Sequence, residues 1–145
     1  MPSLSRTVHV AADASHVFHV LDDFTKTPTW LSRCVHIDEL NSGPHHPGYR
    51  LRYHYRDGRR SGQMQGVIAA RVAQRELRLR FEDNVSKTEI DFEIRPLADG
   101  GTELHYEVDI RPRGMGILFA PAMKRALPAQ MDADINALVE LINKD

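Results

Sequence analysis

The chain has 145 residues, the size of one ordinary domain, with 41% hydrophobic residues, 27% charged residues and a formal net charge of −1. Its 19 Lys and Arg against 20 Asp and Glu leave no excess of positive charge to neutralise phosphates, which argues against a nucleic-acid partner. Cys34 is the single cysteine, so an intramolecular disulfide and a cysteine zinc site are excluded. No segment has the ~20 apolar residues of a membrane span or the apolar core of a secretory signal, so we predict one cytoplasmic domain, residues 1–145.

The start of the sequence predicts a strand followed by a helix. Residues 6–10 alternate polar and apolar side chains, which is the period-two pattern of a strand. Asp13 can cap the helix that follows. A turn or a second short helix is predicted at 27–31. The inward stripe of the first helix consists of Ala14, Val17, Phe18, Leu21 and Phe24.

From residue 35 onward the sequence has the pattern of successive strands. Turn formers such as Asp57-Gly58 and Asp99-Gly100-Gly101 separate them. Alternating strands closed by short turns predict an antiparallel meander with one solvent-exposed face. The register of one strand stays open, because residues 67–70 are apolar on both faces. The predicted strands are residues 35–37, 49–56, 62–72, 77–81, 88–94 and 102–110.

Charged side chains alternate with the apolar ones along these strands, so they share the outer face of the sheet. If the strands follow one another in order, this face is electrically divided. The basic side consists of Arg50, Arg52, His54, Arg56, Arg78 and Arg80. The acidic side consists of Glu89, Asp91, Glu93, Glu103, Glu107 and Asp109.

The end of the chain changes to the helical period. Apolar residues then recur at three- and four-residue steps, which predicts a long amphipathic helix packed on the sheet. Pro128 requires a kink in this helix or a restart. Residues 111–116 hold two glycines beside Met115. This composition predicts a mobile lid near the mouth of a cavity between the sheet and this helix. The helical stripe consists of Phe119, Met123, Leu127, Met131, Ile135, Leu138, Val139 and Ile142.

A strongly curved sheet that grips one helix leaves space where its curvature is greatest, and the inward positions are rich in aromatic and methionine side chains. Such side chains commonly line ligand pockets. The inward positions include no clear Asp, Glu or His, which favours binding over acid–base catalysis. The predicted wall of an internal hydrophobic cavity consists of Trp30, Tyr53, Phe81, Phe92, Tyr106, Phe119, Met123 and Leu127.

The order of the predicted elements resembles the START-like superfamily, also called SRPBCC, and within it the polyketide cyclase/dehydrase-like branch. The resemblance covers essentially the whole chain. It rests on the strand and helix of residues 8–21, Pro28-Thr29-Trp30, Gly48, the strand pair of residues 66–77, and Gly100-Gly101-Thr102-Glu103-Leu104. It implies an α+β helix-grip fold: a curved seven-stranded antiparallel sheet around a long C-terminal helix, with an internal hydrophobic cavity.

The resemblance leaves two classes of function open. Members of the superfamily bind lipids, hormones and polyketides, whereas some cyclise or dehydrate polyketide chains, and no universal catalytic motif carries over to this sequence. We therefore expect binding or carriage of a small apolar ligand, with a cyclase or dehydratase as the alternative. Tyr53 and Tyr106 fit three roles: core residues, orientation of a ligand carbonyl, or polarisation of an enol.

The histidine pairs and the single cysteine are weak candidates for a metal site or a nucleophile. The pairs His16/His19 and His45/His46 have spacings that can chelate a metal, but such pairs are more often solvated. Cys34 has no activating partner in sequence, which favours a buried structural thiol. We therefore predict no metal, no cofactor and a small hydrophobic molecule as the partner, with a monomer and a homodimer both open.

Overall fold

The structure is a computed structural model and describes residues 3–144. Its elements confirm the predicted α+β class. The helices are α1 (Ala14–Asp22), α2 (Thr27–Trp30), the 3₁₀ helix η1 (Gly114–Phe119) and α3 (Ala120–Lys144). The strands are β1 (Ser3–Val10), β2 (Cys34–Glu39), β3 (Arg50–Asp57), β4 (Arg60–Val72), β5 (Glu76–Glu82), β6 (Ser86–Pro96) and β7 (Thr102–Pro112).

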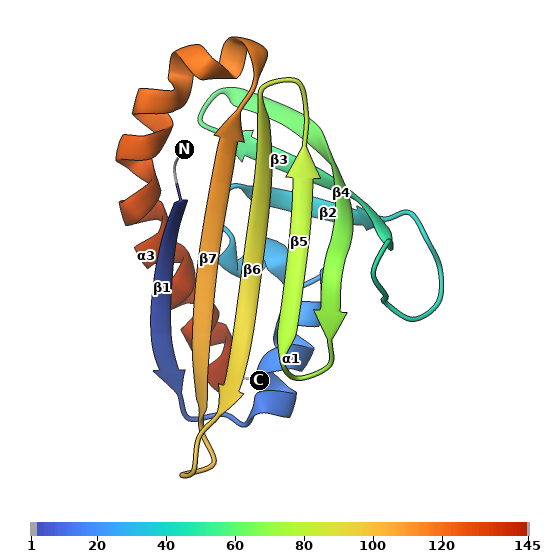
Figure 1. The fold of residues 1–145 in the computed structure, drawn as a ribbon, viewed down its shortest axis with the longest axis vertical. Helices are drawn as coiled ribbons and strands as arrows, with labels where there is room; N and C mark the ends of the chain where they lie inside the picture. The colour runs from blue at the N-terminus through green and yellow to red at the C-terminus, as the bar shows by residue number, and fades with distance from the viewer. Residues whose placement is uncertain (1–2, 145) are drawn as a thin grey trace.

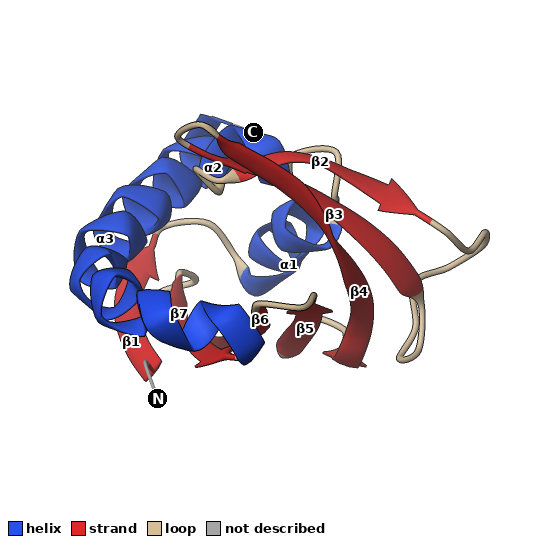
Figure 2. Cartoon of the chain, turned by 90° about the horizontal axis from the view of Figure 1, so that it is seen from above, coloured by secondary structure: helices blue, strands red, loops and turns tan. Residues whose placement is uncertain are grey.

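The strands form one seven-stranded antiparallel sheet in the order β1-β7-β6-β5-β4-β3-β2. Strands β2 to β7 form the predicted meander, and β1 adds to its edge beside β7. The sheet curves around the three α-helices, which all lie on its concave side (Figure 1, Figure 2). This arrangement is the helix-grip fold that the sequence predicted.

Strand β4 makes room for aromatic rings on the concave face by carrying glycines at inward positions. A Cβ atom on Gly66 would lie 2.6 Å from the ring of Phe81, and one on Gly62 would lie 2.8 Å from the hydroxyl oxygen of Tyr55. Both distances are too short for real Cβ contacts, so rings from the neighbouring strands β5 and β3 occupy the space that side chains here would take.

A bulge in β4 explains the segment whose register the sequence left open. Ile68 pairs with Leu79 of β5, but the next pair joins Ala70 to Arg78, so β4 holds one extra residue here. A bulge shifts the alternation of side chains between the two faces. Apolar residues on both faces of residues 67–70 are therefore compatible with one strand.

Helix α3 packs its C-terminal half against the sheet, as the sequence predicted. Ile135, Leu138 and Ile142 are all buried. The helix continues through Pro128 as one element, so it does not restart there. Burying a large aliphatic side chain contributes about 1.5–3 kcal/mol, so this stripe fixes α3 to the fold.

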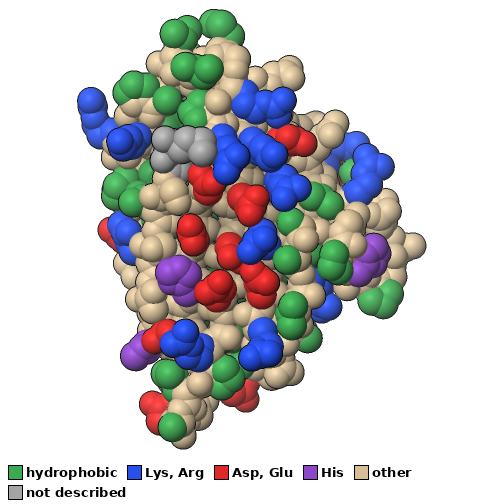
Figure 3. Space-filling model, viewed as in Figure 1, with side chains coloured by type: hydrophobic (Ala, Val, Ile, Leu, Met, Phe, Trp, Pro, Cys, Tyr) green, Lys and Arg blue, Asp and Glu red, His purple; other side chains and the backbone are tan. Residues whose placement is uncertain are grey.

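Predicted basic and acidic side chains of the outer face meet where β5 and β6 lie side by side. Arg78 and Arg80 of β5 lie beside Glu89 and Asp91 of β6, with N–O distances of 3.5–3.6 Å. Acidic side chains gather over the middle of this face (Figure 3). Burial, together with neighbouring carboxylates such as Glu76, raises the pKa of Asp91 to about 6. The carboxyl of Asp91 therefore loses its proton at a higher pH than an isolated aspartate does.

His45 lies in an exposed loop, as its sequence context had suggested, but its own side chain is half-buried and paired. Its Nδ1 lies 3.0 Å from Asp22 Oδ1 and its Nε2 lies 2.8 Å from Glu39 Oε1. The ring also stacks on Phe24 with centroids 4.9 Å apart. Burial lowers the pKa of His45, but the two carboxylates outweigh it and leave this pKa above 6.5. The imidazolium therefore fastens the loop before β3 to α1 and β2.

Replacing His45 with Gln should destabilise the fold in a pH-dependent way. Because the folded-state pKa of His45 is raised, its stabilising charge is fully present below pH 6.5 and is lost as pH rises through the folded pKa. We expect His45→Gln to cost about 1–3 kcal/mol near pH 6 and less at higher pH. Thermal melts across this range test this, with the exposed His9→Gln as control. An equal loss of stability at every pH would contradict stabilisation by the charged His45 side chain.

Candidate functional site

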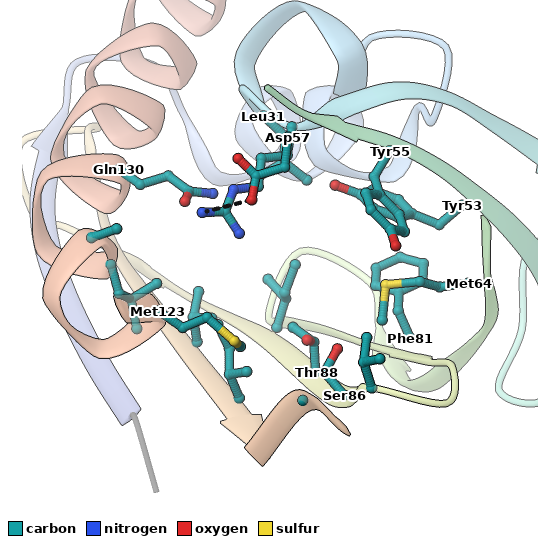
Figure 4. A pocket seen from close by; sticks show the side chains of 18 of the residues that line it. Leu31, Tyr53, Tyr55, Asp57, Met64, Phe81, Ser86, Thr88, Met123 and Gln130 are labelled. Atoms are coloured by element: carbon teal, nitrogen blue, oxygen red, sulfur yellow. Dashed lines mark ion pairs between the residues drawn. The ribbon is translucent and has the colours of Figure 1, made fainter. Parts of the chain in front are cut away.

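A cavity of about 400 Å³ lies between the concave face of the sheet, η1 and the first half of α3 (Figure 4). Cavities of 300–1,000 Å³ are typical of small-molecule sites. Its wall includes exposed residues, among them Arg60, Phe119 and Ala122, so it opens to the surface between η1 and the β3–β4 hairpin. The cavity is thus both enclosed by the fold and reachable from outside.

The residues of α3 explain why the helix does not fill this space. Towards the C-terminus its inward stripe holds large side chains such as Leu138 and Ile142, which are buried against the sheet. Towards the N-terminus the positions that face the cavity include Ala122 and Ala126. A methyl group reaches less far than a leucine side chain, so these two alanines leave room beside Met123 and Leu127, which also line the cavity.

Six of the eight predicted wall residues line this cavity. Trp30 and Phe92 are not among its lining residues. Phe92 stacks on Tyr106 with centroids 5.2 Å apart, and Trp30 meets both rings edge-on at 5.7 and 6.2 Å. Trp30 and Phe92 therefore pack against Tyr106, which does line the cavity. Contact of any of the eight residues with a ligand stays a prediction. The six that line the cavity are Tyr53, Phe81, Tyr106, Phe119, Met123 and Leu127.

The wall is apolar over most of its area. Tyr53 and Phe81 lie with ring centroids 4.7 Å apart, and Met123 of α3 points into the space across from them (Figure 4). Three further strands, β4, β6 and β7, contribute aliphatic side chains and a thioether. These are Met64, Ile90, Val108 and Ile110.

Polar groups enter the cavity from two sides. On one side Arg33 and Asp57 form an ion pair with an N–O distance of 3.6 Å, and Gln130 of α3 lies nearby (Figure 4). On the other side the hydroxyl groups of Ser86 and Thr88 on β6 face the space. A ligand with polar atoms at both ends would find partners on both sides.

The two buried tyrosines keep their hydroxyl protons at any physiological pH. Burial is the largest cause that raises the pKa of Tyr53 and of Tyr106, and the nearby Asp134 raises both pKa values further. Each hydroxyl is therefore a neutral hydrogen-bond donor. Donors of this kind can bind a carbonyl oxygen or stabilise charge that develops on it.

The prediction that no acid faces inward was wrong, because Asp134 of α3 lines the cavity and is only 2% exposed. The backbone N–H of Ser32 donates to its Oδ1 at 3.1 Å. Burial raises the pKa of this carboxyl, while the hydrogen bonds from Ser32 and the charge of Arg33 lower it, and the net shift is upward. Asp134 is thus a titratable group inside an apolar cavity.

The spacing of Asp134 along α3 contained a signal for this position. It follows Leu127 by seven residues and Met131 by three, so it lies on the same inward stripe. The stripe was traced through apolar residues alone. An acidic residue at helical spacing from buried apolar residues indicates a carboxyl on the inward face of the helix.

Cys34 and the histidine pairs contribute nothing to the cavity wall. Burial raises the pKa of the Cys34 thiol to about 12, which fits a structural thiol. His16 Nε2 lies 2.9 Å from the carbonyl oxygen of Ile142. Within residues 3–144, the side chains spaced closely enough for a metal ion are Glu76, Asp91 and Glu93 on the outer face of the sheet.

The segment after β7 forms η1 at the mouth of the cavity. Gly116 is buried there against the backbone of Val85, which lies in the turn between β5 and β6, and a Cβ atom on Gly116 would clash with the Val85 carbonyl. The absence of a side chain therefore lets η1 seat on this turn. The predicted mobility of the segment stays a prediction.

Fold and site together define a helix-grip protein with an internal, mostly apolar cavity. The family model described as polyketide cyclase / dehydrase and lipid transport matches residues 1–143. The chain belongs to this family. No curated protein matches the sequence.

Solved structures share this fold at low sequence identity. A START superfamily protein from Mycobacterium smegmatis is 21% identical with a TM-score of 0.77, covering 98% of this chain and 97% of its own. The ZhuI aromatase/cyclase from Streptomyces sp. R1128 is 19% identical with a TM-score of 0.77, covering 98% and 93%. A protein from Thermus thermophilus is 11% identical with a TM-score of 0.78, covering 99% and 98%. No helix within residues 3–144 is long and apolar enough to cross a membrane.

Replacing Asp134 with Asn should stabilise the protein. A carboxyl whose pKa is raised in the folded state opposes folding once it ionises, so the penalty exists above the usual pKa of 3.8 and vanishes below it. An amide keeps the acceptor for Ser32 without the charge. We expect a higher Tm for Asp134→Asn at pH 7 and no gain near pH 3.5. The exposed Glu140→Gln on the same helix, where the described residues offer no ion-pair partner, is the control, with an expected change within about 0.5 kcal/mol. A lower Tm at pH 7 would contradict this account.

Proposed function

We propose that the protein binds or carries a small, largely apolar molecule in the cavity between the sheet and α3. The single observation behind this proposal is the open cavity of about 400 Å³ with a predominantly apolar wall. Apolar pockets with a few convergent polar groups are the usual form of small-molecule sites. Membership of a family whose description includes lipid transport supports the same proposal.

The polar groups narrow the class of ligand. The hydroxyls of Tyr53 and Tyr106 are donors, and Arg33 adds a positive charge at one side of the wall. We expect an apolar body with a carbonyl or other acceptor oxygen placed near the tyrosines. A second polar atom would lie near Ser86 and Thr88. A cytoplasmic location and a monomeric or dimeric state remain part of this proposal.

A polyketide cyclase or dehydratase-like enzyme is the second candidate, and Asp134 is the observation that favours it. A buried carboxyl with a raised pKa is closer to the working range of a general base than an exposed one. Tyr106 could then donate a hydrogen bond to a substrate carbonyl, while Asp134 accepts a proton from the adjacent carbon. The description of one solved structure of the same fold as an aromatase/cyclase is in line with this candidate.

Filling the cavity should block binding and leave the fold intact. Met123→Trp adds bulk on the helix side of the space. In a close-packed core such overpacking costs about 1–3 kcal/mol, whereas in an open cavity it should cost little or stabilise. We expect an unchanged or higher melting midpoint together with loss of uptake of an apolar fluorescent probe. Val72→Trp, at an exposed site on β4, is the control and should keep probe uptake.

Two outcomes would reject the binding site. The first is a large drop in stability for Met123→Trp with no probe uptake by the unmodified protein. The second is probe uptake that Met123→Trp and Val72→Trp leave equally unaffected, because the probe would then bind elsewhere.

The tyrosine hydroxyls separate the two candidate functions. Tyr53→Phe and Tyr106→Phe remove one donor each and keep the ring. A carrier should lose modest affinity, about tenfold or less. A cyclase should instead lose turnover with binding mostly kept. The measurement is affinity by fluorescence titration and product formation by mass spectrometry, using whichever molecule co-purifies with the protein. Unchanged affinity and unchanged turnover would exclude both tyrosines from the site.

A further inference from the structure

Apolar side chains are concentrated at the mouth of the cavity in an unusual way. Within residues 3–144, seven large hydrophobic side chains are exposed, and four of them lie in η1. Met115 is 65% exposed, Ile117 61%, Leu118 70% and Phe119 50%. Exposed apolar groups clustered like this mark interaction sites more often than scattered ones do.

The anchoring of η1 explains why these side chains point outward. Gly116 is the buried residue of this helix, and its fit against the Val85 backbone leaves no room for rotation of η1 toward the core. Gly114 adopts a left-handed backbone conformation with φ +51°, which sets the turn out of β7. The exposed side chains are thus held in place by the fold.

Positive charge accompanies the apolar side chains. Residues 111–131 contain four cations and no acid, in a chain whose formal net charge is −1. Arg111 and Arg113 pair with Asp109 and Glu82, yet their side chains remain 56% and 51% exposed. Lys124 and Arg125 are exposed and make no ion pair within the described part of the chain. Arg60 adds a fifth cation, 5.7 Å above the ring of Phe119.

We propose that η1 and the first turn of α3 dock on an anionic membrane surface. The four apolar side chains would enter the headgroup region, and the surrounding cations would lie at the level of the lipid phosphates. Figure 3 shows this combination at one end of the molecule, where apolar side chains project and Lys and Arg side chains lie below them. The acidic middle of the sheet lies away from this end.

The geometry favours a bilayer over a second copy of the chain. Two copies joined through η1 would bring Arg111, Arg113, Lys124 and Arg125 of each close together, which is unfavourable for like charges. The side chains also radiate from a narrow 3₁₀ helix with three residues per turn. A fluid lipid surface adapts to side chains that project in several directions.

Docking in this orientation would turn the cavity toward the lipid. Phe119 both lines the cavity and belongs to the exposed cluster. An apolar molecule could then move between cavity and bilayer without crossing water. This consequence rests on the proposed function, but the docking itself does not, because it can be measured on protein without any ligand.

Vesicle co-sedimentation tests the docking. The full chain is mixed with phosphatidylcholine vesicles, and with vesicles in which about a third of the lipid is phosphatidylglycerol. We expect binding to the anionic vesicles that weakens as salt is raised, and little binding to the neutral ones. The double variant Ile117→Ser/Leu118→Ser should lower binding about tenfold or more. Lys124→Gln/Arg125→Gln should lower it and flatten the salt dependence.

Controls separate docking from folding and from ligand binding. Val72→Ser changes an apolar residue on β4 that is 50% exposed and should leave vesicle binding unchanged. Thermal melts establish that every variant folds, and uptake of the apolar probe should persist in Ile117→Ser/Leu118→Ser, because neither residue lines the cavity. If the unmodified protein takes up no probe, the cavity proposal is rejected, and the result of the docking experiment is unaffected.

Three results would overturn the docking. One is no binding of the unmodified protein to anionic vesicles. Another is binding that Ile117→Ser/Leu118→Ser reduces no more than Val72→Ser does. The third is a dimer in light scattering that Ile117→Ser/Leu118→Ser converts to a monomer, because η1 would then be covered by a second copy.

Discussion

The partial fit between one helix and one curved sheet is the constraint on which the rest of this structure depends. The large side chains of Ile135, Leu138 and Ile142 on α3 fill the concave face at one end. At the other end the helix offers alanines, and β4 offers glycines that admit the rings of Tyr55 and Phe81. One end of the molecule therefore supplies stability and the other supplies space. If large side chains of α3 filled the concave face along its full length, there would be no cavity.

Asp134 lies at the boundary between these two ends. It follows the buried Met131 on α3 and faces a cavity whose other polar groups include neutral hydroxyls and the pair of Arg33 and Asp57. A carboxyl buried here opposes folding at neutral pH, whereas an apolar residue at the same position would favour it. Proteins commonly tolerate such a residue where it contacts a ligand or takes part in a reaction. The same residue therefore bears on both candidate functions.

Period-two and helical patterns predicted the strands and the long helix, because these elements bury one face each, whereas the helix-grip arrangement was what the family resemblance implied. The strands, the long helix and six of the cavity-lining residues followed from which side chains share a face. Asp134 was missed because tracing a stripe through apolar residues passes over an acid. The ion pairs of His45 were missed because its partners Asp22 and Glu39 come from other elements. Trp30 and Phe92 have inward parity, but parity cannot tell which inward residues cover one another. Those contacts arise only when distant segments pack.

The alanines of α3 give this architecture a simple route to divergence. Ala122 and Ala126 border the cavity without holding the helix in place, since the large residues nearer the C-terminus do that. A longer side chain at either position would shorten the cavity, and the change would be nearly independent of stability. Selection could therefore alter the preferred ligand by single substitutions while the scaffold persists. The solved structures that keep this fold at 11–21% identity are consistent with a scaffold that tolerates such change.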